Sequence, residues 1–291
     1  MSGRSKNEGE KAFASSQLES SANHQGRGNT LPRSKAAHPI LTVAAAELRN
    51  FWGGAASGIA LLVFLGMQGF FFYNNVASYI LESLGAAARG LSIDATVSLF
   101  SQGLTHVPLV LMLVTPLVTM RSLAPFRRGG GLDFFQTLPV DGATMILGQY
   151  LAALLSLFLL SLLALVPFAA LILLGIGSME MLLTSALGFL ALASAFAAVG
   201  LWASAAFPSP VGAGLATLGT LGMMWLLGWA APYTADGFGK IWRELAFAPR
   251  IVRFVIGLIT PADLLFFASL TFLGLFNARI WLDLRRQTGA D

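Results

Sequence analysis

Few residues in this sequence have the types and spacing that catalysis requires. The 291-residue chain contains three histidines and no cysteine, which excludes disulfides, thiolate nucleophiles and cysteine-ligated metals. No Ser/His pair is placed for hydrolysis, and no cluster of histidines and carboxylates has the spacing of a zinc site. The glycine run at 129–131 lacks the GxxxxGK[ST] spacing of a nucleotide-binding loop and follows no strand. The sequence therefore predicts no enzyme activity, no ATP hydrolysis by this chain, and no cofactor or metal.

The stretch 121–148 combines basic, glycine and aromatic residues and is the most informative part of the chain. Its three glycines break the preceding helix, and Asp133 favours the start of a short helix. Leu138 is disfavoured from helix because Pro139 follows it, so the short helix ends there.

This short helix is apolar on much of its surface. Phe134, Phe135 and Leu138 supply that surface, and Arg127 and Arg128 precede it. An interfacial helix on lipid, with arginines at anionic headgroups, accounts for the composition. A docking helix that inserts into a partner's groove accounts for it equally well. The residues alone leave both interpretations open.

Composition indicates what surrounds this stretch. The chain is 56% hydrophobic and 11% charged, with a mean hydropathy of +0.72. Soluble domains are about a quarter charged, so this chain has too few charges to cover a water-facing surface. The net charge of +4 comes from basic residues beside apolar runs, which membrane orientation explains better than nucleic-acid binding. Residues 1–38 contain no signal peptide and are predicted to form a disordered cytoplasmic tail.

We predict an all-α, polytopic membrane protein, because a helix of about 20 apolar residues crosses the hydrocarbon core. The transmembrane domain covers 39–287, with an interfacial helix before the first span and a short tail at 288–291. The third span has room to bend at Pro167, and Pro208 and Pro210 predict a tight hairpin between spans four and five. Thr260 and Asp263 suit the start of span six. The six predicted spans are 53–73, 104–121, 143–175, 181–207, 211–231 and 261–284.

Six spans place both termini on one side, and the positive-inside rule makes that side cytoplasmic. The basic residues that support this are Arg33, Lys35, Arg49, Arg121, Arg127, Arg128, Arg285 and Arg286. The opposite side carries Arg89, Lys240, Arg243, Arg250 and Arg253. We attribute the last four to an amphipathic interfacial segment at 238–259, with Trp242 and Phe254 on lipid and the cations at headgroups.

The span interiors hold no ionisable group that the sequence places at mid-depth. His106 is predicted at the outer start of span two, where a lone histidine is more often structural than a proton relay. Arg279 and Asp283 are predicted at the inner end of span six. Small residues at 191–198 predict close helix packing. Mild polar residues predict hydrogen bonds between helices rather than a pore, namely Gln68, Thr115, Ser156, Ser161, Thr184, Ser194, Thr217 and Asn277.

The stretch before span three resembles the cytoplasmic segment of ABC-2-type transporter permeases, whose pattern is roughly E-R-R-S-G-T-L-E-x-L-x-x-x-P-V. Phe126 departs from its first glutamate, and Gln149 stands where a lysine is common. Residues 46–51 are similar to the family's E-L-x-x-[YF] helix, and 64–72 resemble the gliding-motility-associated and nitrous-oxide-reductase-maturation branches. The matching residues are Arg127, Arg128, Gly130, Leu132, Pro139, Val140 and Gly148, with Asp133 for the second acid.

The resemblance covers about residues 39–287 and implies the permease subunit of an ABC transporter in a bacterial inner membrane. It implies export of an unidentified substrate, a second permease copy in a homodimer or heterodimer, and a separate ATPase subunit on the cytoplasmic face. The alternatives are a secondary transporter and a non-transporting scaffold of a maturation or motility complex. The residues implied to dock the ATPase are Arg127, Arg128, Gly130, Leu132, Asp133, Phe134, Phe135, Leu138 and Pro139.

Overall fold

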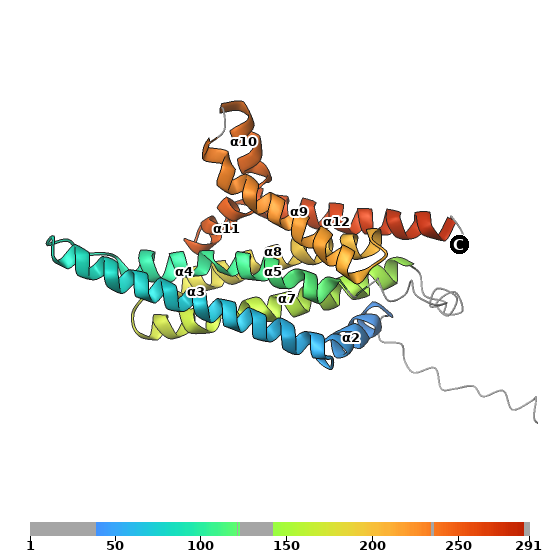
Figure 1. Ribbon diagram of the computed structural model, residues 1–291, viewed down its shortest axis with the longest axis horizontal. Helices are drawn as coiled ribbons and strands as arrows, with labels where there is room; N and C mark the ends of the chain where they lie inside the picture. Colours follow the sequence, from blue (N-terminus) through green and yellow to red (C-terminus); the bar gives the residue numbers. More distant parts are fainter. Residues whose placement is uncertain (1–38, 121, 123–141, 234–235, 288–291) are drawn as a thin grey trace, which may run out of the picture. The chain divides into compact units, whose positions relative to one another are not determined.

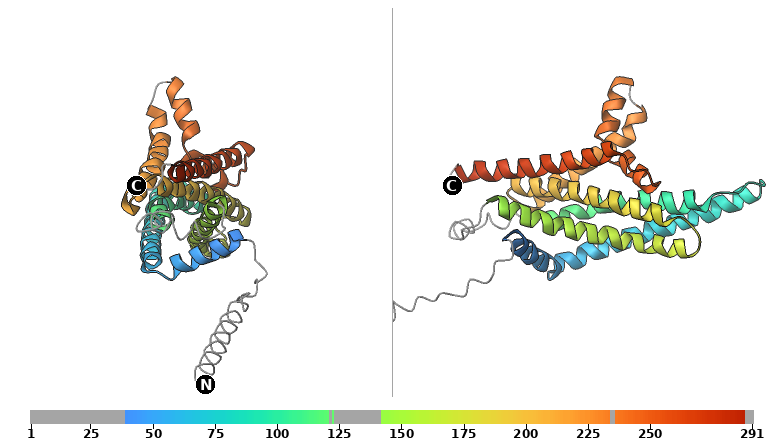
Figure 2. Two further views of the ribbon diagram at one scale, coloured as in Figure 1. Left: turned by 90° about the vertical axis from the view of Figure 1, so that its right-hand side faces the viewer. Right: turned by 180° about the vertical axis from the view of Figure 1, so that it is seen from behind.

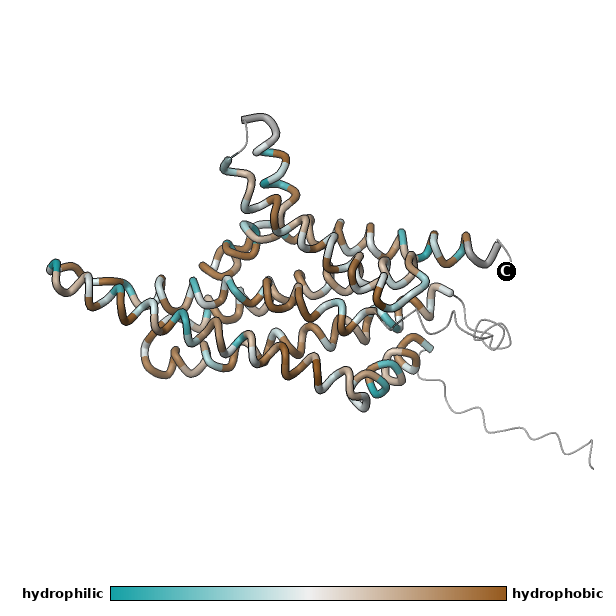
Figure 3. Tube along the Cα trace, in the orientation of Figure 1, coloured by the Kyte–Doolittle hydropathy of each residue, from teal (hydrophilic) through white to brown (hydrophobic). Residues whose placement is uncertain are grey.

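The computed structural model describes residues 39–120, 122, 142–233 and 236–287 (Figure 1). Within these residues every regular element is a helix, and six helices are long and apolar enough to cross a membrane. Figure 3 shows hydrophobic residues along these long helices, with hydrophilic residues gathered mainly toward helix ends. The chain is therefore an all-α, multi-pass membrane protein, and the predicted fold class is confirmed.

Each membrane-length helix overlaps one predicted span. They are α3 (Ala55–Ala87), α7 (Gly142–Leu173), α8 (Met179–Ala206), α9 (Pro210–Ala230), α12 (Pro261–Gln287), and a composite of η1 (Thr96–Ser101), α4 (Gln102–Thr105) and α5 (Val107–Thr119) that we call span two. The shorter elements are α2 (Pro39–Trp52), η3 (Ala231–Tyr233), α10 (Asp236–Leu245) and α11 (Ala248–Val255). A helix, α2, occupies the place of the predicted interfacial helix.

The predicted turn between spans four and five is confirmed, and Pro167 lies within a single helix. Pro167 lies inside α7, which is one continuous helix of 32 residues. The chain turns between α8 and α9, where the Ser209 side chain accepts a hydrogen bond from the amide of Gly212 at 3.0 Å. Pro210 occupies the first helical position of α9. An amide at that position has no partner within the helix, so a proline there costs no hydrogen bond.

Helix α8 lies against α5, α7, α9, α11 and α12, and small residues allow this packing (Figure 1). Ala195, Ala197 and Ala198 are completely buried. A methyl group added at Gly274 of α12 would lie 2.8 Å from the backbone carbon of Ala198. One added at Gly200 would lie 2.3 Å from the hydroxyl of Thr119 on α5. The predicted close packing of span four is confirmed.

Two boundaries differ from the sequence prediction. Helix α3 continues to Ala87, whereas the predicted span ends at residue 73. It continues because polar residues beyond residue 73 still form hydrogen bonds. The Asn74 amide donates to the carbonyl of Phe70 in its own helix at 2.9 Å, and Asn75 donates to the carbonyl of Leu99 at 2.7 Å. Span two begins at Thr96, about two turns before its predicted start at residue 104, and this added segment contains Leu99, the partner of Asn75.

The bundle has two ends, which we name after the short helices there. At the α2 end, α2 packs on the first turns of α7, and Ile146, Leu201 and Ala278 bring together the start of α7 and the ends of α8 and α12. At the α11 end, α11 contacts α4, α8 and α9. Figure 2 shows α2 and the end of α12 at one end, and α10 and α11 away from it.

Candidate functional site

The predicted docking residues lie outside the described part of the chain. Arg127, Arg128, Gly130, Leu132, Asp133, Phe134, Phe135, Leu138 and Pro139 all fall within 123–141. The structure describes the residues on either side, which are Ser122 and Gly142. The geometry of these flanking residues is therefore what bears on the docking prediction.

One buried side chain joins the two flanks. The Gln149 side chain on α7 donates a hydrogen bond from Nε2 to the carbonyl of Ser122, just after α5, at 2.8 Å. Gln149 is 1% exposed and Ser122 is 4% exposed. A buried hydrogen bond of this kind fixes the end of span two beside the start of α7. Ser122 and the start of α7, the described residues on either side of 123–141, therefore both lie at the α2 end.

Helix α2 is fixed at the same place. A methyl group added at Gly148 of α7 would lie 2.6 Å from the Val43 side chain of α2. Glu47, one turn further along α2, is partly buried, and this burial raises the pKa of its carboxyl above the ordinary value. Helix α2 therefore packs directly on the first turns of α7, the helix that follows the stretch carrying the docking prediction.

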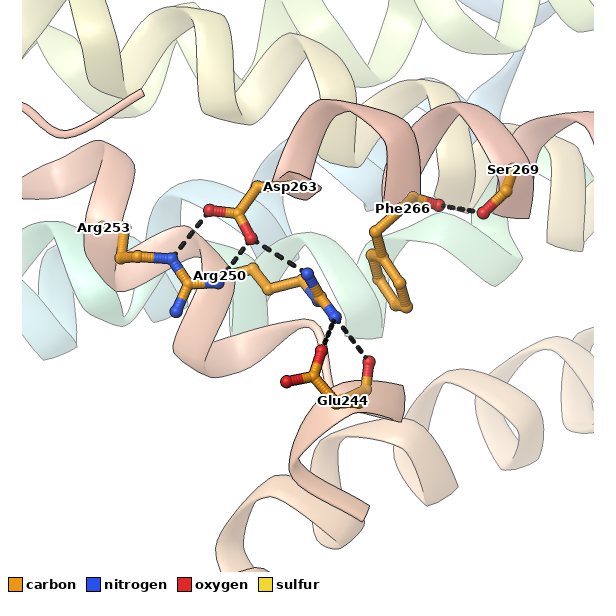
Figure 4. A network of polar contacts seen from close by, with 6 residues as sticks. All are labelled: Glu244, Arg250, Arg253, Asp263, Phe266 and Ser269. Atoms are coloured by element: carbon orange, nitrogen blue, oxygen red, sulfur yellow. Dashed lines mark hydrogen bonds and ion pairs between the residues drawn. The ribbon is translucent and has the colours of Figure 1, made fainter. Parts of the chain in front are cut away.

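The best-defined polar cluster of the described residues lies at the α11 end. Asp263, in the first turn of α12, accepts hydrogen bonds from two arginines of α11 (Figure 4). Arg250 Nη1 lies 3.0 Å from Oδ1, and Arg253 Nε lies 2.7 Å from Oδ2. A further bond joins Arg253 Nη2 to Oδ1. The Asp263 side chain is completely buried.

Arg250 has three further contacts. Its Nη2 donates to the Glu244 carboxylate at 2.6 Å and to the carbonyl of the same residue at 2.8 Å. Its guanidinium carbon lies 4.2 Å from the centre of the Phe266 ring, a cation–π contact. The hydrogen bond to Asp263 also raises the pKa of the Arg253 guanidinium, which keeps it charged. We call Glu244, Arg250, Arg253, Asp263 and Phe266 the α11 charge cluster.

This cluster corrects the predicted role of the segment 238–259. The sequence predicts Phe254 on lipid, but the structure buries it completely against the bundle. Arg250 and Arg253, predicted to reach headgroups, bind Asp263 instead. The sequence predicts that Asp263 favours the positive end of α12, and it does not predict the two ion pairs that the structure shows. Two of the cations that opposed the predicted orientation are thus neutralised within the protein.

The position of His106 is a second correction. Because span two begins at Thr96, His106 lies ten residues inside this helix and not at its start. The helix is interrupted at His106, since Pro108 has no amide to continue the hydrogen-bond ladder. The imidazole stacks on Phe71 of α3 with ring centres 5.0 Å apart. Within the described residues its Nδ1 is buried without a hydrogen-bond partner, as is Oε1 of Gln68.

The prediction of hydrogen bonds between helices holds for Ser194 and fails for most of the other embedded polar residues. Ser194 on α8 bonds to the Tyr150 hydroxyl of α7 and to Thr271 of α12, both at 2.8 Å. The remaining hydroxyls bond to carbonyls of their own helices, as short side chains at helical positions commonly do. These are Thr115, Ser156, Ser161, Thr184 and Thr217, and the Asn277 amide does the same.

A cavity of about 290 Å³ lies between α9, span two and α11. Trp225 and Trp229 of α9 form one wall, and α11 forms another. Its remaining lining residues are Thr105, Pro108, Gly228, Ala248, Pro249, Ile251 and Val252. The cavity is mainly apolar, so it offers space and aromatic surface rather than reactive groups.

No family model and no curated protein matches this chain. The functional conclusion therefore depends on the membrane-spanning fold, the geometry at the two ends of the bundle, and the sequence resemblance of the stretch at the α2 end.

Proposed function

We propose that this chain is the permease subunit of an ABC-2-type transporter, with ATP hydrolysed by a separate subunit. The observation that carries the proposal is the sequence of the stretch 123–141, which resembles the family's docking segment and whose two described flanks lie together at the α2 end. Six membrane-length helices fit such a subunit. Export is the expected direction, and an inner membrane the expected location.

The geometry of the α2 end supports transmission of force from a docked partner. Gln149 ties the end of span two to α7, and the contact of Val43 with Gly148 ties α2 to α7. A push on the stretch between them would act on three helices at once. Arg49 before α3, and Arg127 and Arg128 in the stretch after span two, also support a cytoplasmic α2 end.

Replacing Phe134 and Phe135 together by aspartate is expected to abolish co-purification with the ATPase subunit. Two buried aromatic anchors supply much of the energy of a helix-in-groove contact, and buried carboxylates oppose it. The measurement is pull-down of the ATPase by tagged permease from membranes that contain both. Leucine at the same two positions is the control, and it should retain binding. An intact complex with the aspartate variant would contradict the docking role.

A second copy of the chain is expected on the face formed by α3, α5 and α9. Helix α5 contacts both other helices, and the long exposed faces of α3 and α9 need lipid or a partner. Small residues on such faces let helix backbones approach closely. The glycines with open space beside them are Gly58, Gly66 and Gly69 of α3 and Gly219 and Gly222 of α9.

The absence of cysteine makes this face testable without further engineering. Single variants Gly69→Cys and Gly219→Cys are expected to form disulfide-linked dimers in membranes treated with an oxidant. Phe272→Cys, on the exposed face of α12, is the control and should remain monomeric. Equal cross-linking at all three positions would indicate random collision and would argue against a dimer on this face.

A secondary transporter is the second candidate, favoured by one observation. Span two has a one-residue break at His106, and interrupted spans with an ionisable group are typical of ion-coupled carriers. Reconstituted vesicles separate the two candidates. Transport that needs ATP and the partner subunit supports the permease, whereas transport driven by a pH gradient without ATP supports the carrier.

A further inference from the structure

The two short helices between α9 and α12 are both amphipathic, but their surroundings differ. Helix α11 turns its apolar side into the bundle, where Ile251 and Phe254 are at most 1% exposed, and its arginines bind Asp263. Helix α10 also has apolar residues along one side, but there Ile241 is 56% exposed and Leu245 is 47% exposed. The protein therefore covers the apolar side of α11 and leaves the apolar side of α10 uncovered.

The cations of α10 are likewise without a partner in the described part of the chain. Lys240 and Arg243 lie away from the apolar side of the helix, are exposed, and form no ion pair with a described residue. The neighbouring Glu244 is paired with Arg250 of α11 instead. An exposed pair of unpaired cations beside an apolar surface is complementary to a membrane surface that carries anionic headgroups.

The place of α10 in the fold puts it at the edge of the hydrocarbon core. Helix α9 has 21 residues, which gives a length of about 30 Å, close to the thickness of that core. Trp229 and Tyr233, at the end of α9, are exposed, with ring centres 5.9 Å apart, and exposed aromatic residues of these two types are enriched at membrane interfaces.

The direction of α10 fits this position. Figures 1 and 2 show α10 directed away from the bundle, across the long axis of the membrane-length helices. Because those helices cross the membrane, a helix that runs across them lies along the membrane plane, as interfacial amphipathic helices do.

We propose that α10 binds the lipid surface at the α11 end of the bundle. Ile241 and Leu245 enter the boundary between acyl chains and headgroups, and Lys240 and Arg243 bind anionic headgroups. The apolar side supplies the attachment, and each cation favours anionic lipid by about fivefold. This interaction requires only the membrane-spanning fold, so it does not depend on the permease assignment.

The contact with lipid is tested with single cysteines, because the natural chain has none. Ile241→Cys and Arg243→Cys are two residues apart, so they place the same fluorophore on opposite sides of α10. The full-length protein is held in lipid nanodiscs. We expect the label at Ile241→Cys to be quenched by nitroxides on the lipid acyl chains and protected from acrylamide in the water, with the reverse at Arg243→Cys.

Two results of this experiment would overturn the proposal. Equal quenching by acrylamide at both positions would place α10 in water. Protection of the label at Ile241→Cys from both quenchers would mean that a protein surface, such as a second copy of the chain, covers the apolar side of α10.

The preference for anionic headgroups is measured with the label at Ile241→Cys, in nanodiscs of equal parts phosphatidylcholine and phosphatidylglycerol. The nitroxide is carried by one lipid in the first sample and by the other lipid in the second, so the composition stays the same. We expect labelled phosphatidylglycerol to quench at least about twofold more than labelled phosphatidylcholine, because the two cations enrich the anionic lipid around α10.

Two double variants provide the controls for this preference. Lys240→Gln with Arg243→Gln should bring the ratio of the two quenching efficiencies toward one. Lys240→Arg with Arg243→Lys keeps both charges and should retain the ratio. Equal quenching by the two lipids in the presence of the natural cations, or a ratio that the glutamine pair leaves unchanged, would overturn the role of Lys240 and Arg243.

Discussion

Replacing Asp263 by alanine is expected to lower the free energy of unfolding by about 3–5 kcal/mol, the usual cost of removing one partner of a buried ion pair. The Asp263 side chain is completely buried, and the Arg250 side chain is 8% exposed. The substitution removes the buried partner of the Arg250 guanidinium and leaves it paired with the Glu244 carboxylate, which is 75% exposed. Arg253 is 39% exposed and can be solvated more readily. Most of the loss is therefore assigned to Arg250.

Denaturation by SDS in mixed micelles measures this loss. The matched control is Asp283→Ala near the other end of the same helix, where Arg279 and Asp283 form an exposed pair at 3.7 Å. An exposed pair four residues apart in a helix contributes about 0.5 kcal/mol or less, so this control should change little. Similar losses for the two variants would mean that the α11 charge cluster is no more important than a surface pair.

Local composition predicts the number of helices well and their ends poorly. Each span contains enough consecutive apolar residues to be recognised in isolation. The end of α3 is different, because Asn75 looks like an interruption in the sequence. In the structure its amide bonds to the carbonyl of Leu99 at 2.7 Å, in a π-helical turn that no apolar count would indicate. The partner lies 24 residues away, so only the tertiary structure shows why the helix continues.

The same reason explains the error at α11. An amphipathic segment with arginines beside aromatic residues is typical of a helix lying on lipid. Asp263 follows Arg253 by ten residues, across a turn and in the next helix, so no helical or strand period links them. The aspartate also suited a simpler role at the start of α12. The sequence contained both halves of the ion pair without showing that they meet.

For the candidate docking site, the sequence provides the residues and the structure describes only their flanks. Its residues were identified from the pattern of arginine, glycine, aromatic and proline residues at 127–139, and this range lies outside the described part. The structure contributes the geometry at its flanks, through the hydrogen bond from Gln149 to the carbonyl of Ser122. The sequence shows a glutamine in an apolar span, but it does not predict that this side chain bonds to a backbone carbonyl 27 residues away.

Replacing Gly274 by leucine is expected to destabilise the protein by about 3 kcal/mol or more, at the upper end of the effects of overpacking. A Cβ at this position would lie 2.8 Å from the backbone carbon and 2.9 Å from the carbonyl oxygen of Ala198. Backbone atoms in the middle of α8 cannot turn aside as a side chain can. The two helices must separate, and α8 carries with it contacts to α5, α7, α9 and α11.

Gly85→Leu in α3 is the matched control for this prediction, because a Cβ at Gly85 would find only the Arg89 side chain, at 3.9 Å. Leucine favours helix over glycine, so the control should be neutral or more stable by up to about 1 kcal/mol. The same chemical change thus has opposite expected signs at two helical glycines. SDS denaturation in mixed micelles measures both variants. A Gly274→Leu protein as stable as the natural one would show that α8 and α12 are further apart than the structure has them, and would remove the physical basis for placing α8 at the centre of the bundle.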